Sequence, residues 1–220
     1  MGEESGSGVD RTPIGDLAMM ILGIGQSCGK DFAAALSTFE ALLAMKLRLR
    51  AGEIEIIDVQ TNIVNIYDLL GRDAEALPLR QQIYGRSKVL FGPSHENTII
   101  DASNLARSLF SLKHYTPCKE LALEVMPTAR RSLGPAHQCT LSLRFTYAKS
   151  LFLDMRDGEG KQQSNEQYLD DCRLAERIFE ADIRTSSRTY GAANKQTKDR
   201  EGVLDELHKM MEFCGGRSSS

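Results

Sequence analysis

The sequence predicts an all-α fold in which antiparallel helix pairs stack into a solenoid. Two segments that match by eye, Phe91–Thr98 and Leu133–Thr140, lie 42 residues apart. Self-similarity at a period of this size is typical of repeat proteins, in which each unit buries its apolar face only against its neighbours. Between the matching segments the apolar residues recur with a helical period, and each segment carries a Gly-Pro pair that ends a helix.

Each repeat is expected to hold two helices. In the first helix apolar residues recur at i, i+3, i+4 and i+7, which marks one face of a helix. A turn is predicted near Gly71, and a second helix from about Ala74 to Leu90. This helix should end at Gly92-Pro93, because glycine accepts the left-handed conformation and proline cannot continue a helix. The apolar face of the first helix consists of Ile63, Ile66, Tyr67 and Leu70.

The same period links other positions along the chain. Gly29 precedes Gly71 by 42 residues and is therefore expected to occupy the equivalent turn. Small residues at the start of the second helix should let the two helices of a pair approach closely. Threonines that follow the links are expected to cap the next helix. The small residues are Ala34, Ala76 and Cys118, and the threonines are Thr98, Thr140 and Thr197.

The repeats divide the chain as follows. Residues 12–213 form the repeat domain, with units at about 13–55, 56–97, 98–139 and 140–196 and a capping helix at 197–213. The tails, 1–11 and 214–220, are expected to be disordered.

Two units depart from the pattern. Gly23 and Gly25 weaken the first helix, which suits a terminal capping unit. Gly134 and Gly191 are 57 residues apart, so the last unit holds 15 extra residues. These are expected to form an enlarged loop around 157–165, within 156–169, because that segment is rich in glycine and polar residues.

The pattern resembles the long tetratricopeptide repeats (TPR) of kinesin light chains. The residues that carry the resemblance are Leu77-Pro78-Leu79, Val89-Leu90-Phe91-Gly92-Pro93, Asn104-Leu105-Ala106 and Lys113-His114-Tyr115. The resemblance covers about residues 13–213 and implies a right-handed α-solenoid, the TPR-like superhelix. The chain lacks the sustained heptads that a motor-binding coiled coil would need.

Composition indicates a protein of the cytoplasm. A net charge of −3 gives no broad attraction to nucleic acid or to a membrane surface. The five cysteines contain no CxxC pair, and their scattered arrangement favours reduced thiols. No apolar run approaches the roughly 18 residues that span a bilayer. We therefore expect neither nucleic acid nor membrane among the partners, and the sequence leaves the oligomeric state open.

No motif in the sequence predicts catalysis, a metal or a cofactor. The segment Ile21–Asp31 approximates a phosphate-binding loop, but Ile24 replaces its first glycine and Asp31 its hydroxyl residue. His95 and His137 lie one period apart and are expected to hydrogen-bond nearby helix ends. His114 and His208 have no partner at a metal-ligand spacing. Cys139 lies two residues from His137 but shows no other sign of an activated nucleophile. The chain is therefore not expected to be an enzyme.

The remaining candidate is a groove lined by the first helix of each pair, which the resemblance implies is the concave, peptide-binding side. Asparagine side chains offer both a donor and an acceptor to the backbone of an extended peptide. Arg107 and Lys149 would favour an acidic segment. The predicted groove residues are Thr61, Asn62, Asn65, Ser103, Asn104, Arg107, Phe145, Thr146, Lys149 and Phe152.

Two functional classes remain open. The first is a protein-interaction scaffold that binds a peptide or protein segment in this groove. The second is a structural protein that bridges components or self-associates through its ends, without peptide binding. At the level of residues, Asn62 and Asn104 either contact a ligand or bridge adjacent helices.

Overall fold

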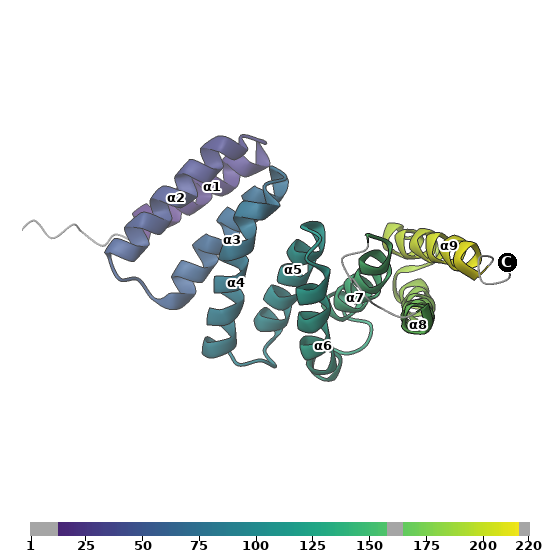
Figure 1. Cartoon of the computed structure of the whole chain (residues 1–220). Helices are drawn as coiled ribbons and strands as arrows, with labels where there is room; N and C mark the ends of the chain where they lie inside the picture. The colour runs from purple at the N-terminus through teal and green to yellow at the C-terminus, as the bar shows by residue number, and fades with distance from the viewer. Residues whose placement is uncertain (1–12, 158–164, 216–220) are drawn as a thin grey trace, which may run out of the picture. The chain divides into compact units, whose positions relative to one another are not determined.

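A computed structural model describes residues 13–157 and 165–215 (Figure 1). Over these residues the chain forms nine helices and no strand, which confirms the predicted all-α fold. The helices are α1 (Pro13–Cys28), α2 (Phe32–Arg48), α3 (Glu53–Leu69), α4 (Asp73–Leu90), α5 (Glu96–Ser111), α6 (Tyr115–Ser132), α7 (Gln138–Asp157), α8 (Asn165–Tyr190) and α9 (Lys195–Gly215).

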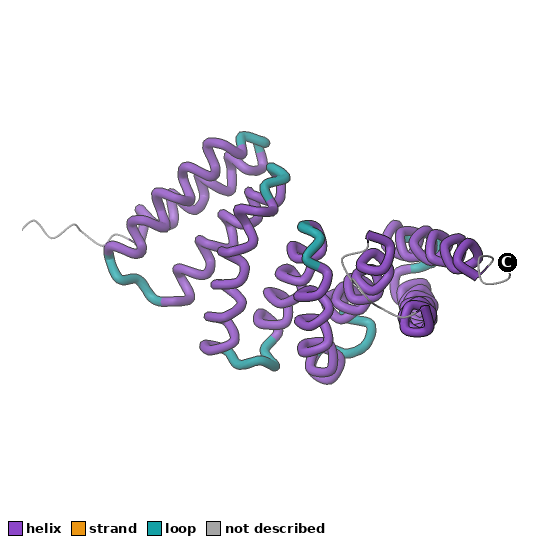
Figure 2. The backbone as a smooth tube through the Cα atoms, viewed as in Figure 1, coloured by secondary structure: helices purple, strands orange, loops and turns teal. Residues whose placement is uncertain are grey.

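The helices belong to two compact units. Unit 1 comprises residues 1–79 and unit 2 residues 80–220, so α4 begins in unit 1 and ends in unit 2. In unit 1, α2 packs against both α1 and α3. In unit 2, α7 packs against α5, α6 and α8, and α8 packs against α9. Apart from α7 and α8, whose connection lies outside the described residues, helices that follow one another along the chain are joined by short loops (Figure 2).

The tight turns inside the pairs depend on one residue in the left-handed conformation. Gly71 has φ 67° and Lys113 φ 62°, one period apart. In the first pair Gly29 lies in the turn, as predicted, but the left-handed residue is the next one, Lys30, with φ 63°. The first pair is therefore offset by one residue from the 42-residue period.

The offset also changes which small residue of the first pair is buried where the two helices cross. Ala76 and Cys118 are fully buried, as the close approach of paired helices requires. The fully buried residue of the first pair is Ala35, whereas the predicted Ala34 is partly exposed. The prediction for Ala34 was therefore wrong by one position.

The helices that precede three of the links between pairs end at glycines, as predicted. Gly92, Gly134 and Gly191 have φ values of 85°, 93° and 91°, directly after helices α4, α6 and α8 or one residue later. These left-handed values strongly favour glycine, because a Cβ would crowd the backbone.

The predicted threonine caps were wrong, and the capping groups lie three residues earlier. His95 Nδ1 accepts a hydrogen bond from the amide of Asn97 at 3.2 Å, and His95 is the N-cap of α5. His137 repeats this bond with the amide of Cys139 at 3.3 Å. The prediction that the two histidines bond a nearby helix end is thereby confirmed. Thr98 is buried in the first turn instead, where its hydroxyl donates to the carbonyl of Ser87.

The core of unit 1 is an apolar cluster with one buried cation beside it. The cluster joins α2 and α3 through Phe39, Leu42, Val59 and Ile63, all nearly inaccessible to solvent. Lys46 of α2 is 7% exposed and forms ion pairs with Asp16 of α1 and Glu55 of α3. Burial by itself would lower the pKa of Lys46, but the hydrogen bonds and charges of Asp16 and Glu55 together outweigh it and raise the pKa. One ammonium thus ties the three helices of this unit together.

The glycines of α1 provide a matched test of packing. A Cβ on Gly23 would lie 2.7 Å from Cζ of Phe39, whose ring is buried in the core, whereas a Cβ on Gly25 would meet nothing within 4 Å. We expect Gly23→Ala to lower the free energy of unfolding by about 1–3 kcal/mol through overpacking. Gly25→Ala should raise it by up to about 1 kcal/mol through helix propensity. Urea denaturation of both variants checks this, and equal shifts would contradict the packing.

The extra residues of the last repeat do not all lie in the predicted loop. Most of the predicted loop, residues 158–164, lies outside the described residues, but Asp157 and Asn165 lie in helices α7 and α8. The extra length is partly helical, since α8 has 26 residues and α6 has 18. Helix α9 continues to Gly215, beyond the predicted end at 213. Over the described residues, no helix combines the length and apolar character that crossing a membrane requires.

Candidate functional site

The predicted groove residues of unit 1 lie on α3. Asn65 is exposed, whereas Thr61 and Asn62 are partly buried. The Thr61 hydroxyl donates to the carbonyl of Ile57 at 2.8 Å. Asn62 Nδ2 donates to the carbonyl of Asp58 at 2.9 Å and lies 3.7 Å from the sulfur of Met20 on α1. Asn62 therefore makes a contact to the adjacent helix, as the structural alternative expects.

The other predicted residues lie on α5 and α7, two helices of unit 2 that pack against each other. Arg107 is exposed, and Asn104, Phe145 and Lys149 are partly exposed. These four side chains are accessible to a ligand. Three more are buried and contribute to the packing beneath the surface: Ser103, Thr146 and Phe152.

Lys149 lies between two aromatic rings. Its ammonium nitrogen is 4.9 Å from the centroid of Phe110 on α5 and 5.4 Å from that of Phe145 on α7. Partial burial lowers the pKa of this lysine, while the carboxylates of Glu206 and Asp199 act in the opposite direction. The ring faces attract the cation and remove part of its water. Lys149 is therefore a fixed, partly desolvated positive charge.

Phe145 connects this charge to a buried ionic cluster of α7, α8 and α9. The guanidinium of Arg200 lies 5.1 Å from the Phe145 centroid, on the same ring that Lys149 contacts. Phe179 meets that ring nearly edge-on, with centroids 5.7 Å apart and an interplanar angle of 70°. Arg200 is 5% exposed. The Phe145 ring is thus held by two cations and a second ring.

Asp182 supplies the negative charge of the cluster. It is fully buried, and Arg144 Nη1 lies 3.1 Å from its Oδ1. Burial raises the pKa of Asp182 to about 6, although Arg144 and Arg200 both act to lower it. Neither oxygen accepts a well-directed hydrogen bond from another described residue. The ion pair therefore compensates the loss of water only in part.

The sequence did contain a signal for this cluster. Asp182 stands 57 residues after Val125 and 99 after Ile83, both buried apolar residues, and Arg200 stands 57 after the buried Leu143. Charged residues at apolar positions of a repeat mark a local departure from simple packing. Phe110, three residues after Arg107, was also missed as the platform under Lys149.

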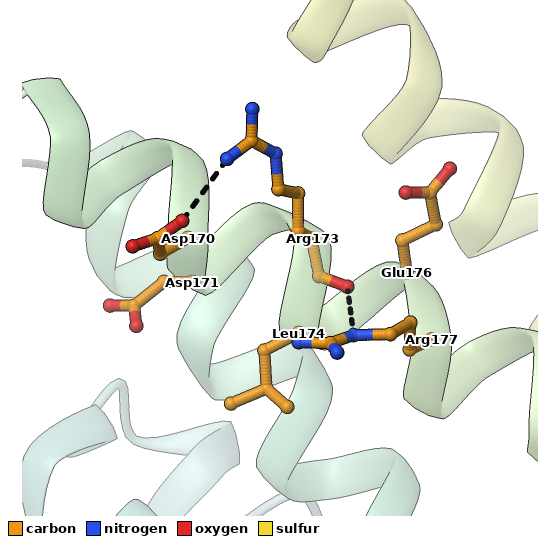
Figure 3. A pocket seen from close by; sticks show the side chains of 6 residues that line it. All are labelled: Asp170, Asp171, Arg173, Leu174, Glu176 and Arg177. Atoms are coloured by element: carbon orange, nitrogen blue, oxygen red, sulfur yellow. Dashed lines mark hydrogen bonds and ion pairs between the residues drawn. The ribbon is translucent and has the colours of Figure 1, made fainter.

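A separate hollow of about 670 Å³ lies beside α8. Its lining side chains all come from this one helix and point in different directions (Figure 3). Arg173 pairs with Asp170 at 3.1 Å, and Arg177 donates to the carbonyl of Arg173 at 3.3 Å. Glu176 contacts His208 of α9 at 2.8 Å. The charges are thus directed within the helix or toward α9 and do not converge on one point in the hollow.

The other chemically suggestive residues have structural surroundings. Gly29 and Lys30 form the turn after α1, and Asp31 Oδ1 caps α2 by accepting from the amide of Ala34 at 3.2 Å. Burial raises the pKa of the Cys139 thiol, with Glu96 adding to the shift, which is opposite to what an activated thiolate requires. Among the residues with a described position, no three His, Cys, Asp or Glu side chains gather as a metal site would require.

Comparison with known proteins gives the same fold. No family model matches the sequence, and no curated protein matches it. Among solved structures, a Podosopora anserina protein described as a putative kinesin light chain with nearly identical TPR-like repeats aligns at 15% identity with a TM-score of 0.62, over 94% of this chain and 96% of its own. A single-substitution variant of that protein aligns at 15% identity with a TM-score of 0.63, over 90% of this chain and 92% of its own.

Another solved structure has the same type of fold. BtubC (BKLC) from P. vanneervenii aligns at 16% identity with a TM-score of 0.65, over 91% of this chain and 77% of its own. At these identities the similarity concerns the fold. The chain therefore has a TPR-like α-solenoid fold.

Proposed function

We propose that the chain is a protein-interaction scaffold and that α5 and α7 of unit 2 hold an extended, acidic peptide segment. The observation that carries the proposal is Lys149, a partly desolvated cation held over Phe110 and Phe145. A TPR-like fold supports the coarser statement of a role in protein interaction. We include in the proposal that the chain acts in the cytoplasm and has no catalytic activity of its own.

The charge of this face favours a carboxylate. Lys149 and the exposed Arg107 present positive charge, and Arg200 adds a third cation behind Phe145. A ligand carboxylate that reached Lys149 would meet an ammonium that has already lost part of its water. The binding therefore incurs less of the usual desolvation cost, and a preorganised cation binds more strongly than a mobile surface lysine.

Asn104 would contribute the contact to the peptide backbone. Its amide is partly exposed, and it lies one turn of α5 before the exposed Arg107. One amide can accept from a backbone N–H and donate to a backbone carbonyl at the same time. We propose that Asn104 fixes the direction of the peptide, while Arg107 and Lys149 select acidic side chains. Ser103, Thr146 and Phe152 would hold the surface from beneath.

Thr61, Asn62 and Asn65 would form a separate contact surface on α3 of unit 1. Asn65 is its most accessible member. Because Asn62 also contacts Met20, this surface depends on the packing of α1. We assign it a secondary part in the proposal, since the side chains carry no charge that would select a ligand.

Charge reversal tests the role of α5 and α7. A peptide-display library is selected on the immobilised protein, and we expect the selected peptides to be rich in Asp and Glu. Titration of one such peptide by fluorescence anisotropy should show about tenfold weaker binding, or more, for the double variant Arg107→Glu/Lys149→Glu. The dependence of affinity on salt should also become shallower, because fewer ions are paired.

The matched control is Arg130→Glu/Arg131→Glu on α6. It changes the net charge of the protein by the same amount at two exposed positions that belong to neither α5 nor α7. Its peptide affinity should remain within about twofold of the unmodified protein. Equal weakening by both double variants would show that only overall charge matters, and would refute the assigned face.

A further inference from the structure

Helix α1 exposes an apolar face that the peptide-binding proposal does not use. Leu17 and Ile21 are each 60% exposed, Leu22 53% and Ile24 46%. Ala18, Gly25 and Cys28 lie on the same helix near them. Leu17, Ile21 and Ile24 lie within about 60° of one another around the helix axis, whereas Leu22 lies about 100° from Ile21 and flanks them. Together the four side chains leave on the order of 400 Å² of apolar surface in water, the range in which patches on soluble proteins are often functional.

The face carries no charge. Asp16 is the one charged residue within α1, and its carboxylate pairs with Lys46 of α2. A helix that is apolar on nearly all sides is normally covered on all sides. A terminal repeat that ends a solenoid in water needs a polar outer face, so the first pair does not have the character expected of a cap.

We propose that this face of α1 binds α1 of a second copy of the chain, with the two helices antiparallel. The spacing of the exposed residues supports a self-complementary contact. Leu17, Ile21, Ile24 and Cys28 follow one another at intervals of four, three and four residues, a pattern that is unchanged when the helix is reversed. In an antiparallel pair Leu17 would lie beside Cys28 of the second copy, and Ile21 beside Ile24.

The physics of the contact favours a symmetric partner. In a two-fold interface each residue group faces its own kind, so a charged face would repel its copy, whereas an uncharged face does not. Antiparallel helices also place the positive end of each helix dipole beside the negative end of the other. Gly25 leaves this part of the helix surface uncovered, since a Cβ there would meet nothing within 4 Å inside its own chain.

The area of the contact sets its strength. With Ala18, Gly25 and Cys28 included, two such faces would bury on the order of 1,000 Å², the lower limit for a specific interface. We therefore expect a dimer that forms at micromolar concentration and is in exchange with the monomer. This association is independent of the peptide surface on α5 and α7.

Sedimentation analysis of the full chain tests the proposal. The mass should rise from 24.4 kDa toward twice this value between about 1 and about 200 μM, which brackets the affinity expected of a small interface. Ile21→Glu should remain monomeric throughout, because the substitution places like charges at the centre of the contact. Leu17→Lys serves as a second variant, with circular dichroism to show that both are folded.

Val89→Glu is the matched control, since Val89 is 85% exposed and lies on α4. It should dimerise like the unmodified protein. Crosslinking with a short bismaleimide tests the orientation: Leu17→Cys should give a covalent dimer through Cys28, and Leu17→Cys/Cys28→Ser should not. A protein that stays monomeric at about 200 μM, or an Ile21→Glu variant that still dimerises, would overturn the proposal. Efficient crosslinking of the unmodified protein through Cys28 alone would overturn the antiparallel arrangement.

Discussion

Replacement of Arg200 by leucine is expected to lower the free energy of unfolding of unit 2 by about 1.4 kcal/mol at pH 7, because the pKa of Asp182, about 6, lets the carboxyl take up a proton and limits the loss. Arg200 is 5% exposed and lies beside Asp182, which is fully buried. Without Arg200, the Asp182 carboxylate would keep only Arg144 as a charged neighbour. Loss of Arg200 raises the pKa of Asp182 further, so the carboxyl takes up a proton at pH 7, and the cost of this protonation appears as lost stability.

Replacement of both partners should have the opposite effect. Asp182→Val/Arg200→Leu introduces the residue types that stand at the equivalent positions of the preceding repeat, Val125 and Leu143, which are buried there. Exchange of a buried ion pair for well-packed apolar residues commonly leaves stability unchanged or raises it by about 1–4 kcal/mol. Phe179, already fully buried nearby, would gain apolar neighbours. The pair of variants thus separates the value of the ion pair from the cost of breaking it.

Urea denaturation, with hydrogen exchange at the amides of α8 and α9, measures both variants. The control is Arg173→Leu on α8, whose side chain is 62% exposed, and we expect a change within about 0.5 kcal/mol. If the double variant proved less stable than Arg200→Leu, the charged cluster would stabilise unit 2 by more than the burial of its charges costs. That result would refute the conclusion that the ion pair compensates the loss of water only in part.

The fold was predictable because the same helix-ending and packing residues recur in successive repeats. Gly92 and Gly134 end two helices in the same way, and the buried residues at Ala76 and Cys118 follow the period. Errors arose where two neighbouring residues could both fill the same structural position. The left-handed residue of the first turn is Lys30, next to Gly29, so an alignment on the glycine placed the first pair one residue too early.

The site was less predictable, because its properties depend on contacts between helices. Helical periodicity placed Asn104, Arg107 and Lys149 on their helices, but it did not show that Ser103, Thr146 and Phe152 are buried. The burial of a residue near the edge of an amphipathic face depends on the size of its neighbours on the next helix. The contact of Lys149 with Phe110 could not be read from either helix alone.

The capping residues illustrate the same limit. Threonine and histidine both offer a side-chain acceptor near the start of α5, and threonine is the commoner cap. The structure uses His95, because the chain path buries Thr98 where its hydroxyl meets the carbonyl of Ser87. The sequence contains both residues, and only the path of the link decides between them.

The Asp182 carboxyl also makes stability depend on pH. Its pKa is about 6 in the folded chain and about 3.8 when exposed, so the folded state holds this proton more tightly than the unfolded state does. The resulting contribution to stability is fully present below about pH 3.8 and is lost as the pH rises through about 6. A shift of about two pKa units corresponds to about 3 kcal/mol. Asp182→Asn keeps the size of the side chain and removes its titration.

The measurement is the difference in unfolding free energy between the unmodified protein and Asp182→Asn, taken by urea denaturation from about pH 4 to about pH 7.5. Taking the difference removes the contribution of other titrating groups, which both proteins share. As the pH rises across this range, the unmodified protein should lose about 3 kcal/mol of unfolding free energy relative to Asp182→Asn. The midpoint of this loss should lie between the two pKa values. A difference that moved in favour of the unmodified protein as the pH rose would mean that Arg144 and Arg200 outweigh burial. The carboxylate would then be a net stabilising partner of α7 and α9, and the apolar double variant of the same site would be expected to lose stability as well.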